Sequence, residues 1–356
     1  MKRIVICADG TWNQRDQVDK VTKKRRPTNV TKVARAVRPR AGNGTDQVVC
    51  YHDGVGTAEG LDKFTGGAFG HGIEGNIREL YRFLVYNYEA GDELYFFGFS
   101  RGAFTVRTLI GFMNKVGLIQ KDDDYYVPDL YAYYESGKGP DSQEYTLAYH
   151  NIKDPRPCPP IRFVGVWDTV GALGAPGFLG QLLNKNKYQY HDVNLNANIQ
   201  NAYHALAIDE ERKPFAPNIW TRPANWSGTL EQIWFAGVHS NVGGGYAPDG
   251  LANEALHWLV EKAEGLGLEF DKVFLGYYKP CFNSVLQDSM TVLYRTMGRY
   301  VRPIGQADGE AVHQSAVDRM NLPECDYHPD NLRVYLAGPG NTPLVGTARV
   351  PRGTPC

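Results

Sequence analysis

The chain has 356 residues, of which 42% are hydrophobic and 22% are charged, and its formal net charge is −1 at pH 7. This composition is that of an ordinary globular protein long enough to bury a sizeable core. A net charge close to zero excludes a global field that would recruit nucleic acid or an anionic bilayer, so we expect no nucleic-acid partner.

The sequence offers no segment for crossing a membrane or for export through a signal peptide. No stretch approaches the roughly 18 to 20 apolar residues that a membrane helix needs, and the apolar run within residues 1–7 is too short for a secretory signal. The six cysteines lie far apart without a C-x-x-C pair, which predicts reduced thiols and neither a disulfide framework nor a zinc site. We therefore expect no stable membrane insertion, and a protein that is cytoplasmic or exported without a cleavable signal peptide.

The first ninety residues alternate between predicted strands and helices. A β-branched run at residues 3–8 predicts a buried parallel strand that ends at Asp9. Residues 28–38 predict an amphipathic helix, residues 47–52 a second strand and residues 73–88 a second helix. This alternation is typical of an α/β fold with a mostly parallel central sheet and helices on both faces.

The most informative stretch is residues 93–106, E-L-Y-F-F-G-F-S-R-G-A-F-T-V. A short apolar strand runs into Gly98-Phe99-Ser100-Arg101-Gly102, and an apolar-periodic helix follows at once. In this setting G-x-S-x-G is typical of a nucleophile elbow, in which the glycines let strand and helix approach closely and the turn exposes the serine hydroxyl. The alternative is a small-residue turn between a buried strand and a helix. The context favours an α/β-hydrolase-like fold with loop and helical insertions, and Ser100 as its nucleophile.

After the elbow, strands alternate with predicted insertions. Residues 120–160 are rich in Asp, Tyr and Pro with weak periodicity, which predicts an insertion over the sheet that acts as a lid or substrate rim. Residues 176–198 predict a second insertion of this kind. Between the two insertions, residues 161–167 predict a strand that ends at Asp168, and residues 198–208 are predicted to be helical.

The last strong strand of the predicted core spans residues 232–238 and runs into His239. Residues 270–356 predict a helical and irregular C-terminal extension with one strand at residues 332–336. No linker or internal repeat separates these elements, so we expect residues 1–356 to form a single α/β-hydrolase domain.

A serine hydroxyl is a weak nucleophile, so Ser100 requires a base within hydrogen-bonding reach and an acid that orients the base. In an α/β-hydrolase these residues follow in the order Ser, Asp, His, at the carboxyl ends of strands. Asp168 and His239 satisfy the order and the strand-end placement, so we predict them as orienting acid and base. His204, in a predicted helix, is interpreted as a structural or substrate-contact residue, and Asp209 is the alternative acid.

Acyl transfer also requires hydrogen-bond donors for an oxyanion. The N–H of Arg101, which follows the nucleophile, is one candidate, and the N–H groups of Gly10 and Thr11 after the first strand are candidates for the other. Asp9 precedes that turn. It either holds the turn by hydrogen bonds, which common turn chemistry favours, or it touches substrate or a cation.

The sequence contains no motif for a metal or cofactor, and we expect neither. H-E-x-x-H and paired Cys/His spacings are absent, although Asp9, Asp53 and Asp168 all end predicted strands and could share a cation. Asp-Gly-Thr at residues 9–11 also leaves open a metal-dependent phosphohydrolase that uses Asp9. The second Asp two residues away, which such loops pair with the first, is missing.

Several sequence blocks occur in order along the chain: A-D-G-T-W-N (8–13), Y-H-D-G-V-G-T (51–57), G-F-S-R-G-A-F-T-V-R (98–107), V-G-V-W-D-T-V-G-A-L-G (164–174), H-A-L-A-I-D-E-E-R (204–212), G-V-H-S-N-V-G-G-G-Y (237–246) and V-H-Q-S-A-V-D-R-M (312–320). Together they resemble the α/β-hydrolase domain of the first type VI secretion lipase effector family. Phospholipase members of that family use a Ser, Asp, His triad, and the matching positions here are Ser100, Asp168 and His239. The chain departs from the family at Asn241, where Asp often follows His-Ser, so Asn241 is a further possible substrate or structural position.

We therefore expect a serine hydrolase that cleaves carboxylic esters through an acyl-enzyme. Acyl esters of lipids are the substrate class that the resemblance implies. A non-catalytic binding protein on a hydrolase fold and the metal-dependent phosphohydrolase stay open as alternatives. The predicted partner is a small-molecule or lipid ester, and the sequence does not indicate an oligomeric state.

Overall fold

The structure is a computed structural model of the chain. It describes residues 1–10, 13, 16, 18, 23, 25–54, 66–171 and 194–339, and for residues 66–71 it describes the backbone alone. All statements below concern these residues.

A parallel sheet forms the centre of the described part of the chain. Its seven strands lie in the order β2-β1-β3-β4-β5-β6-β7, and each neighbouring pair is parallel. The strands are β1 Arg3–Ala8, β2 Gln47–His52, β3 Glu93–Phe99, β4 Ile161–Trp167, β5 Asn201–Ala207, β6 Thr229–Phe235 and β7 Glu310–Val312. Because all strands run the same way, their carboxyl ends meet at one edge of the sheet.

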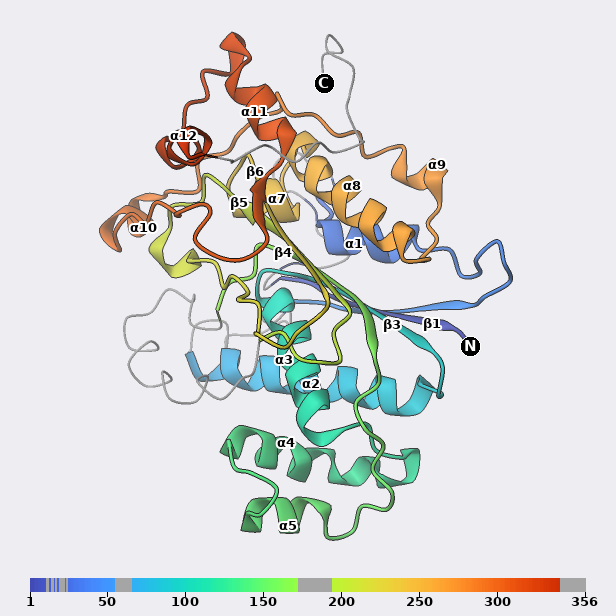
Figure 1. Ribbon diagram of the computed structural model, residues 1–356. Coiled ribbons are helices and arrows are strands. Elements are labelled where there is room, and N and C mark those ends of the chain that lie inside the picture. Colours follow the sequence, from blue (N-terminus) through green and yellow to red (C-terminus); the bar gives the residue numbers. More distant parts are fainter. Residues whose placement is uncertain are drawn as a thin grey trace.

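Helices cover both faces of the sheet (Figure 1). Helices α2 (Gly66–Asn87) and α3 (Arg101–Val116) lie on one face, and α1 (Asn29–Ala36) and α8 (Gly250–Gly265) lie on the other. The predicted fold class, an α/β fold with a parallel central sheet between helices, is confirmed.

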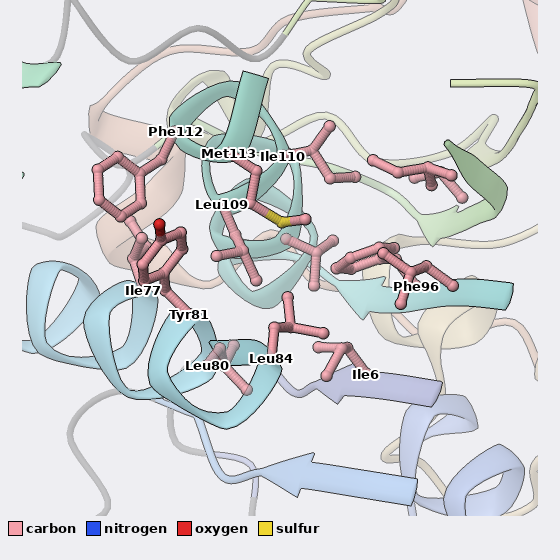
Figure 2. Packing of buried hydrophobic residues seen from close by; sticks show 14 of the residues in the cluster. Ile6, Ile77, Leu80, Tyr81, Leu84, Phe96, Leu109, Ile110, Phe112 and Met113 are labelled. Atoms are coloured by element: carbon pink, nitrogen blue, oxygen red, sulfur yellow. The ribbon is translucent and has the colours of Figure 1, made fainter. Parts of the chain in front are cut away.

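The side chains of the strands alternate between two buried cores. Figure 2 shows the core on the α2 and α3 side, where Ile6 of β1 and Phe96 of β3 meet Leu84 of α2 and Leu109 of α3. The next residue of β3, Phe97, faces the opposite core. Full burial of such a side chain stabilises the fold by about 1.5–3 kcal/mol. Strand β3 is therefore packed against a buried core on each face, directly before Ser100.

Two predicted elements are wrong. Residues 198–208 form no helix: β5 spans Asn201–Ala207 and pairs with β4 and β6. The segment N-A-Y-H-A-L-A lacks β-branched residues, but tertiary burial between two strands overrides its local propensity. The strand predicted at residues 332–336 is instead part of helix α12 (Asp330–Ala337), whose buried Leu332 and Tyr335 lie three residues apart on one helix face.

The insertion at residues 120–160 contains η2 (Lys121–Tyr126), α4 (Val127–Ser136) and α5 (Gln143–Tyr149). Its helices lie below α2 and α3 in Figure 1, and the Tyr149 hydroxyl donates to the carbonyl oxygen of Val116 at 2.9 Å. Val116 is the last residue of α3, whereas Ser100 precedes its first turn. The second predicted insertion, residues 176–198, lies outside the described residues except for its last five positions.

The C-terminal extension returns to the sheet. It contributes β7 beside β6 and the helices α9 (Lys272–Leu275), α10 (Val292–Thr296), α11 (Gln314–Met320), η4 (Pro323–Cys325) and α12. A third buried cluster joins Trp234 of β6 and Leu206 of β5 to Ala316 of α11 and Leu332 of α12. The extension therefore supplies the edge strand beside β6, and its helices pack against residues of β5 and β6.

The prediction that the cysteines are reduced is wrong at Cys281. Reduced thiols are found at Cys7, Cys50, Cys158 and Cys325, whereas Cys281 is disulfide-bonded. Wide spacing along the chain says little about distance in the fold, so sequence alone could not exclude this bond.

Candidate active site

The elbow between β3 and α3 places Ser100 at the carboxyl edge of the sheet. Ser100 has φ +58° and ψ −124°, a conformation that a residue with a Cβ adopts only under constraint. The two flanking glycines make the turn possible. A Cβ on Gly98 would lie 2.6 Å from the Cα of Ala103, and one on Gly102 would lie 2.2 Å from the carbonyl oxygen of Ala8. Strand, helix and the end of β1 are therefore in close contact around the serine.

Ser100, His239 and Asp168 form one hydrogen-bonded chain. The Nε2 atom of His239 lies 2.7 Å from the Oγ atom of Ser100, and its Nδ1 atom lies 2.5 Å from Oδ2 of Asp168. All three side chains are buried. Asp168 directly follows β4, whereas His239 begins the short helix α7 (His239–Gly243), after β6 has ended at Phe235. The structure thus brings together the three residues that sequence order and strand-end placement selected. They follow β3, β4 and β6, and β5 lies between β4 and β6.

Aromatic rings hold the imidazole plane of His239. The ring of Phe99 lies 4.6 Å from the imidazole centroid, and the ring of Phe215 lies 5.0 Å away at an interplanar angle of 77°. The backbone N–H of His239 also donates to Oε2 of Glu210 at 3.2 Å. These contacts limit rotation of the ring and keep both nitrogens directed at their partners.

Asp168 receives a second set of hydrogen bonds from a buried arginine that the sequence did not single out. Arg302 donates from Nη1 to Oδ1 at 2.6 Å and from Nη2 to Oδ2 at 3.1 Å, and both side chains are 0% exposed. The backbone N–H of Ala207 completes the set with a bond of 3.1 Å to Oδ1. Arg302 lies in the C-terminal extension, between α10 and β7.

The surroundings of Asp168 and His239 favour different protonation states in the two side chains. Burial would raise the pKa of Asp168, but the Arg302 charge and the hydrogen bonds from His239 and Arg302 outweigh it and hold that pKa well below its ordinary value. For His239, burial lowers the pKa and outweighs the raising effect of Asp168. At neutral pH the carboxylate is therefore ionised, and the imidazole is neutral and able to accept a proton.

The N–H groups predicted as oxyanion donors have different surroundings in the structure. Arg101 is the first residue of α3, and the first N–H groups of a helix have no acceptor within that helix. The N–H of Gly10 donates to Oδ1 of Asp9 at 2.7 Å, so it is engaged, and Thr11 lies outside the described residues. A Cβ on Gly10 would lie 3.1 Å from the Cβ of Ser100, which shows that the turn after β1 contacts Ser100.

Asp9 is fully engaged within the protein. Its Oδ2 atom accepts hydrogen bonds from the hydroxyls of Thr28 at 2.5 Å, Tyr51 at 2.7 Å and Thr31 at 3.1 Å, and Oδ1 accepts the N–H of Gly10. Burial raises the pKa of Asp9, and these bonds oppose that effect. The arrangement fits the structural interpretation of Asp9, because its oxygens already hold the loop after β1 to α1 and β2.

The remaining candidates surround the three-residue chain without joining it. His204 lies on β5, where its Nε2 accepts the N–H of Thr169 at 3.1 Å, and burial lowers its pKa to about 3. Asp209 accepts from the N–H of Gly237 at 2.6 Å and from a tyrosine hydroxyl, so it does not orient His239. The side chain of Asn241 accepts the N–H of Gln287 at 3.1 Å and thus ties α7 to the C-terminal extension.

Glu210 is a second residue that the sequence analysis did not select. Besides the N–H of His239, it accepts two bonds of 2.8 Å from Arg212 and a bond from Ser289. The block H-A-L-A-I-D-E-E-R contained it, but Asp209 was weighed in its place. A contact between an acidic side chain and the backbone N–H of a distant residue such as His239 leaves no local pattern in the sequence.

Neither a metal cluster nor a membrane span is found in the part of the chain that the structure describes. No group of three or more His, Cys, Asp or Glu side chains is arranged to hold an ion there. Among the same residues, no helix has both the length and the apolar character needed to cross a bilayer. Asp53, the third strand-end carboxylate, joins no such group.

Comparison with known proteins gives one family. The family described as "T6SS, Phospholipase effector Tle1-like, catalytic domain" matches residues 2–262. An uncharacterized protein of Saccharomyces cerevisiae, YEL023C, is 27% identical over 202 residues, which cover 49% of this chain and 27% of the yeast protein.

Two solved structures are similar to the chain. An uncharacterized protein from Pseudomonas aeruginosa has a TM-score of 0.48 and 17% identity over 76% of this chain and 46% of that one. The Tle1 effector bound to the VgrG spike of the type VI secretion system has a TM-score of 0.39 and 20% identity over 69% of this chain and 51% of that one. This chain thus spans about half of these two proteins and about a quarter of the yeast protein.

Proposed function

The chain belongs to the family of Tle1-like phospholipase effector catalytic domains, and from this premise we propose that it is a serine hydrolase that cleaves the acyl esters of phospholipids. The observation that supports this most is the chain of hydrogen bonds from Ser100 through His239 to Asp168, with distances of 2.7 and 2.5 Å. A serine at a strained elbow, hydrogen-bonded to a histidine that is itself hydrogen-bonded to an aspartate, has the geometry that acyl transfer requires.

In the proposed reaction, Oγ of Ser100 attacks the ester carbonyl carbon while Nε2 of His239 accepts the serine proton. The imidazolium that forms is stabilised by the ionised Asp168 carboxylate. Collapse of the tetrahedral intermediate breaks the bond to the alcohol, which leaves with the proton from His239. Water then attacks the acyl-serine carbonyl carbon while His239 accepts its proton. The bond to Oγ of Ser100 breaks, Ser100 regains the proton from His239, and the fatty acid is released.

The tetrahedral intermediate needs donors for its negative oxygen. We assign one to the N–H of Arg101 at the start of α3, where the helix dipole also favours negative charge. The loop after β1 supplies the second in this proposal, because it touches Ser100. The N–H of Thr11 is the sequence candidate that remains there, since the N–H of Gly10 is bonded to Asp9.

A fluorophosphonate probe tests the nucleophile. We expect the probe to label the wild-type protein and a Ser142→Ala control, in which a half-buried serine that caps α5 is replaced. Ser100→Ala should lose labelling together with esterase activity, by on the order of 10⁴-fold or more. Equal labelling of wild type and Ser100→Ala would falsify the assignment.

Vesicles of phosphatidylethanolamine and phosphatidylglycerol test the substrate class. Mass spectrometry should detect lysophospholipid and free fatty acid after incubation with the wild-type protein and neither product with Ser100→Ala. Cleavage of short nitrophenyl esters with intact vesicle lipids would identify a soluble esterase instead. Inactivity on both substrates, without probe labelling, would favour the binding-protein alternative.

A further inference from the structure

Arg302 connects the C-terminal extension to the predicted acid of the site. Its guanidinium donates to both oxygens of Asp168, and the same two nitrogens donate to the carbonyl oxygens of Ala207 at 2.9 Å and Phe215 at 2.6 Å. A planar guanidinium held by four bonds cannot rotate without breaking several of them. The position of the charge beside Asp168 is therefore fixed.

The backbone of Arg302 is held as well. The amide of Asn331 donates to the carbonyl oxygens of Arg302 and Ile208, both at 3.0 Å, and the N–H of Tyr300 donates to the carbonyl oxygen of Glu211 at 2.9 Å. Residues 300–302 thus run along the segment that follows β5. The extension is therefore bonded to the segment after β5 through Tyr300 before the arginine and through Asn331 after it.

The bonds from Arg302 determine how Asp168 faces His239. Oδ1 is occupied by Arg302 and by the N–H of Ala207, while Oδ2 is shared between Arg302 and Nδ1 of His239. The carboxylate can present only Oδ2 to the base. Without Arg302, the carboxylate could turn about its terminal bond, which is a soft torsion.

We expect the charge of Arg302, which acts directly on Asp168, also to limit the basicity of His239. An imidazolium beside a bare carboxylate would be strongly stabilised, whereas here the carboxylate is already balanced by a cation. The other charged groups that act on His239 are Arg212 and Glu210 after β5, and His204 on β5, whose pKa is lowered by burial and by Arg107, is neutral. Unlike those groups, Arg302 donates hydrogen bonds directly to Asp168.

We infer that Arg302 is a positioning residue of this site, which orients Asp168 toward His239 and makes the extension after residue 262 part of the catalytic unit. The inference rests on the proposed function. The matched family region ends at residue 262, so the inference assigns a role to a segment outside that match.

Two substitutions separate the roles of charge and geometry. Arg302→Lys keeps a cation but cannot bridge both carboxylate oxygens in one plane, and Arg302→Met removes the cation while filling most of its volume. We expect kcat on a soluble nitrophenyl ester to fall about 10²-fold or more for Arg302→Met and about tenfold for Arg302→Lys, as for supporting residues of other sites. KM should change by less than about threefold, because Arg302 does not face the substrate.

The pH profile provides a readout that a purely structural role would not move. In Arg302→Met the acid limb of kcat/KM should shift upward by about one pH unit, because loss of a neighbouring cation favours the imidazolium and the protonated carboxyl. Arg333→Met is the control, since Arg333 lies in the same extension with a side chain that is 65% exposed. This control should keep the wild-type kcat and acid limb.

A double-mutant cycle tests whether Arg302 acts through Asp168. Adding Arg302→Met to Asp168→Asn should lower kcat by less than about threefold further, because its target is already lost. A full multiplicative loss, or an unmoved acid limb in Arg302→Met, overturns the inference. Failure of the proposed function is distinct, because the wild-type protein would then resist fluorophosphonate. If Arg302→Met does not fold, Arg302→Lys carries the test, alone and added to Asp168→Asn.

Discussion

Asp9 and Asp168 stand at the carboxyl ends of β1 and β4, the two strands that flank β3. Both carboxyls are buried, with 3% and 0% of the residue exposed. Neutral hydroxyls and a backbone N–H surround Asp9, and burial raises its pKa. A guanidinium and an imidazole surround Asp168, and its pKa is depressed despite greater burial.

The difference shows that the partners, and not the depth of burial or the position on the sheet, decide what a strand-end carboxylate can do. Asp9 joins the loop after β1 to α1 and β2 and leaves no oxygen free for chemistry. Asp168 presents one oxygen to His239 and remains ionised. Substitutions around these two carboxylates test this contrast.

Exchange of each aspartate for asparagine separates their roles. Asp168→Asn should lower kcat on a nitrophenyl ester about 10⁴-fold, because the amide can no longer stabilise an imidazolium or hold the correct tautomer. Asp9→Asn should keep kcat within about tenfold, since an amide retains an acceptor for the surrounding hydroxyls. Circular dichroism must show that both variants are folded. The reverse order of the two losses would place the chemistry at β1.

Gly102 tests how closely α3 must approach the end of β1. In Gly102→Ala the new Cβ would lie 2.2 Å from the oxygen of Ala8 and 2.4 Å from that of Asp9, so the free energy of unfolding should fall by about 3 kcal/mol. Gly75→Ala is the matched control, because nothing lies within 4 Å of a Cβ there and helix propensity should add about 0.5–1 kcal/mol. Urea unfolding measures both. A loss in the control as large as that in Gly102→Ala would remove the steric explanation.

The two carboxyls should give stability opposite dependences on pH. The folded pKa of Asp168 is depressed, so its contribution is present above the unfolded value of about 3.9 and is lost as pH falls below that value. The folded pKa of Asp9 is raised, so its contribution is present below about 3.9 and is lost as pH rises through the folded value. Each slope can reach about 1.4 kcal/mol per pH unit.

Urea titrations between pH 3 and pH 7 measure these slopes. The stability difference between wild type and Asp168→Asn should grow with pH up to about pH 4. The difference between wild type and Asp9→Asn should change in favour of the variant above that pH. Slopes of the same sign for both variants would contradict the assigned environments.

The smallest effect concerns one donor to Asp9. Tyr51→Phe removes a hydrogen bond of 2.7 Å to a carboxylate and should lower stability by about 1–2 kcal/mol, with kcat unchanged. Tyr277→Phe, at a residue that is 76% exposed, should leave the midpoint of unfolding where it is. A fall in kcat for Tyr51→Phe with unchanged stability would connect Asp9 to the reaction.

Much of the fold was predictable because its signals are local. The runs that became β1, β2 and β4 are rich in β-branched or aromatic residues, and the structure gives them the predicted bounds. Strand β5 was missed because its alanines and leucine favour a helix, and only its two neighbours in the sheet make it a strand. Local patterns cannot report such neighbours.

The candidate site shows the same division. Ser100, Asp168 and His239 could be selected because an elbow motif and strand ends mark them in the sequence. Arg302 stands in a Pro-containing segment, V-R-P, with no periodicity around it. Its importance depends on a carboxylate 134 residues earlier in the chain, and no local pattern records a pair so distant.

That separation imposes an order on biosynthesis. A ribosome delivers Ser100, Asp168 and His239 well before Arg302, so a nascent chain that has already closed β3, β4 and β6 must bury the Asp168 carboxylate without its cation or leave it hydrated. Hydration is the cheaper course for an unpaired carboxylate. The centre of the sheet therefore stays open to water at this edge until the segment with Arg302 emerges, and only then is the geometry of the proposed site complete.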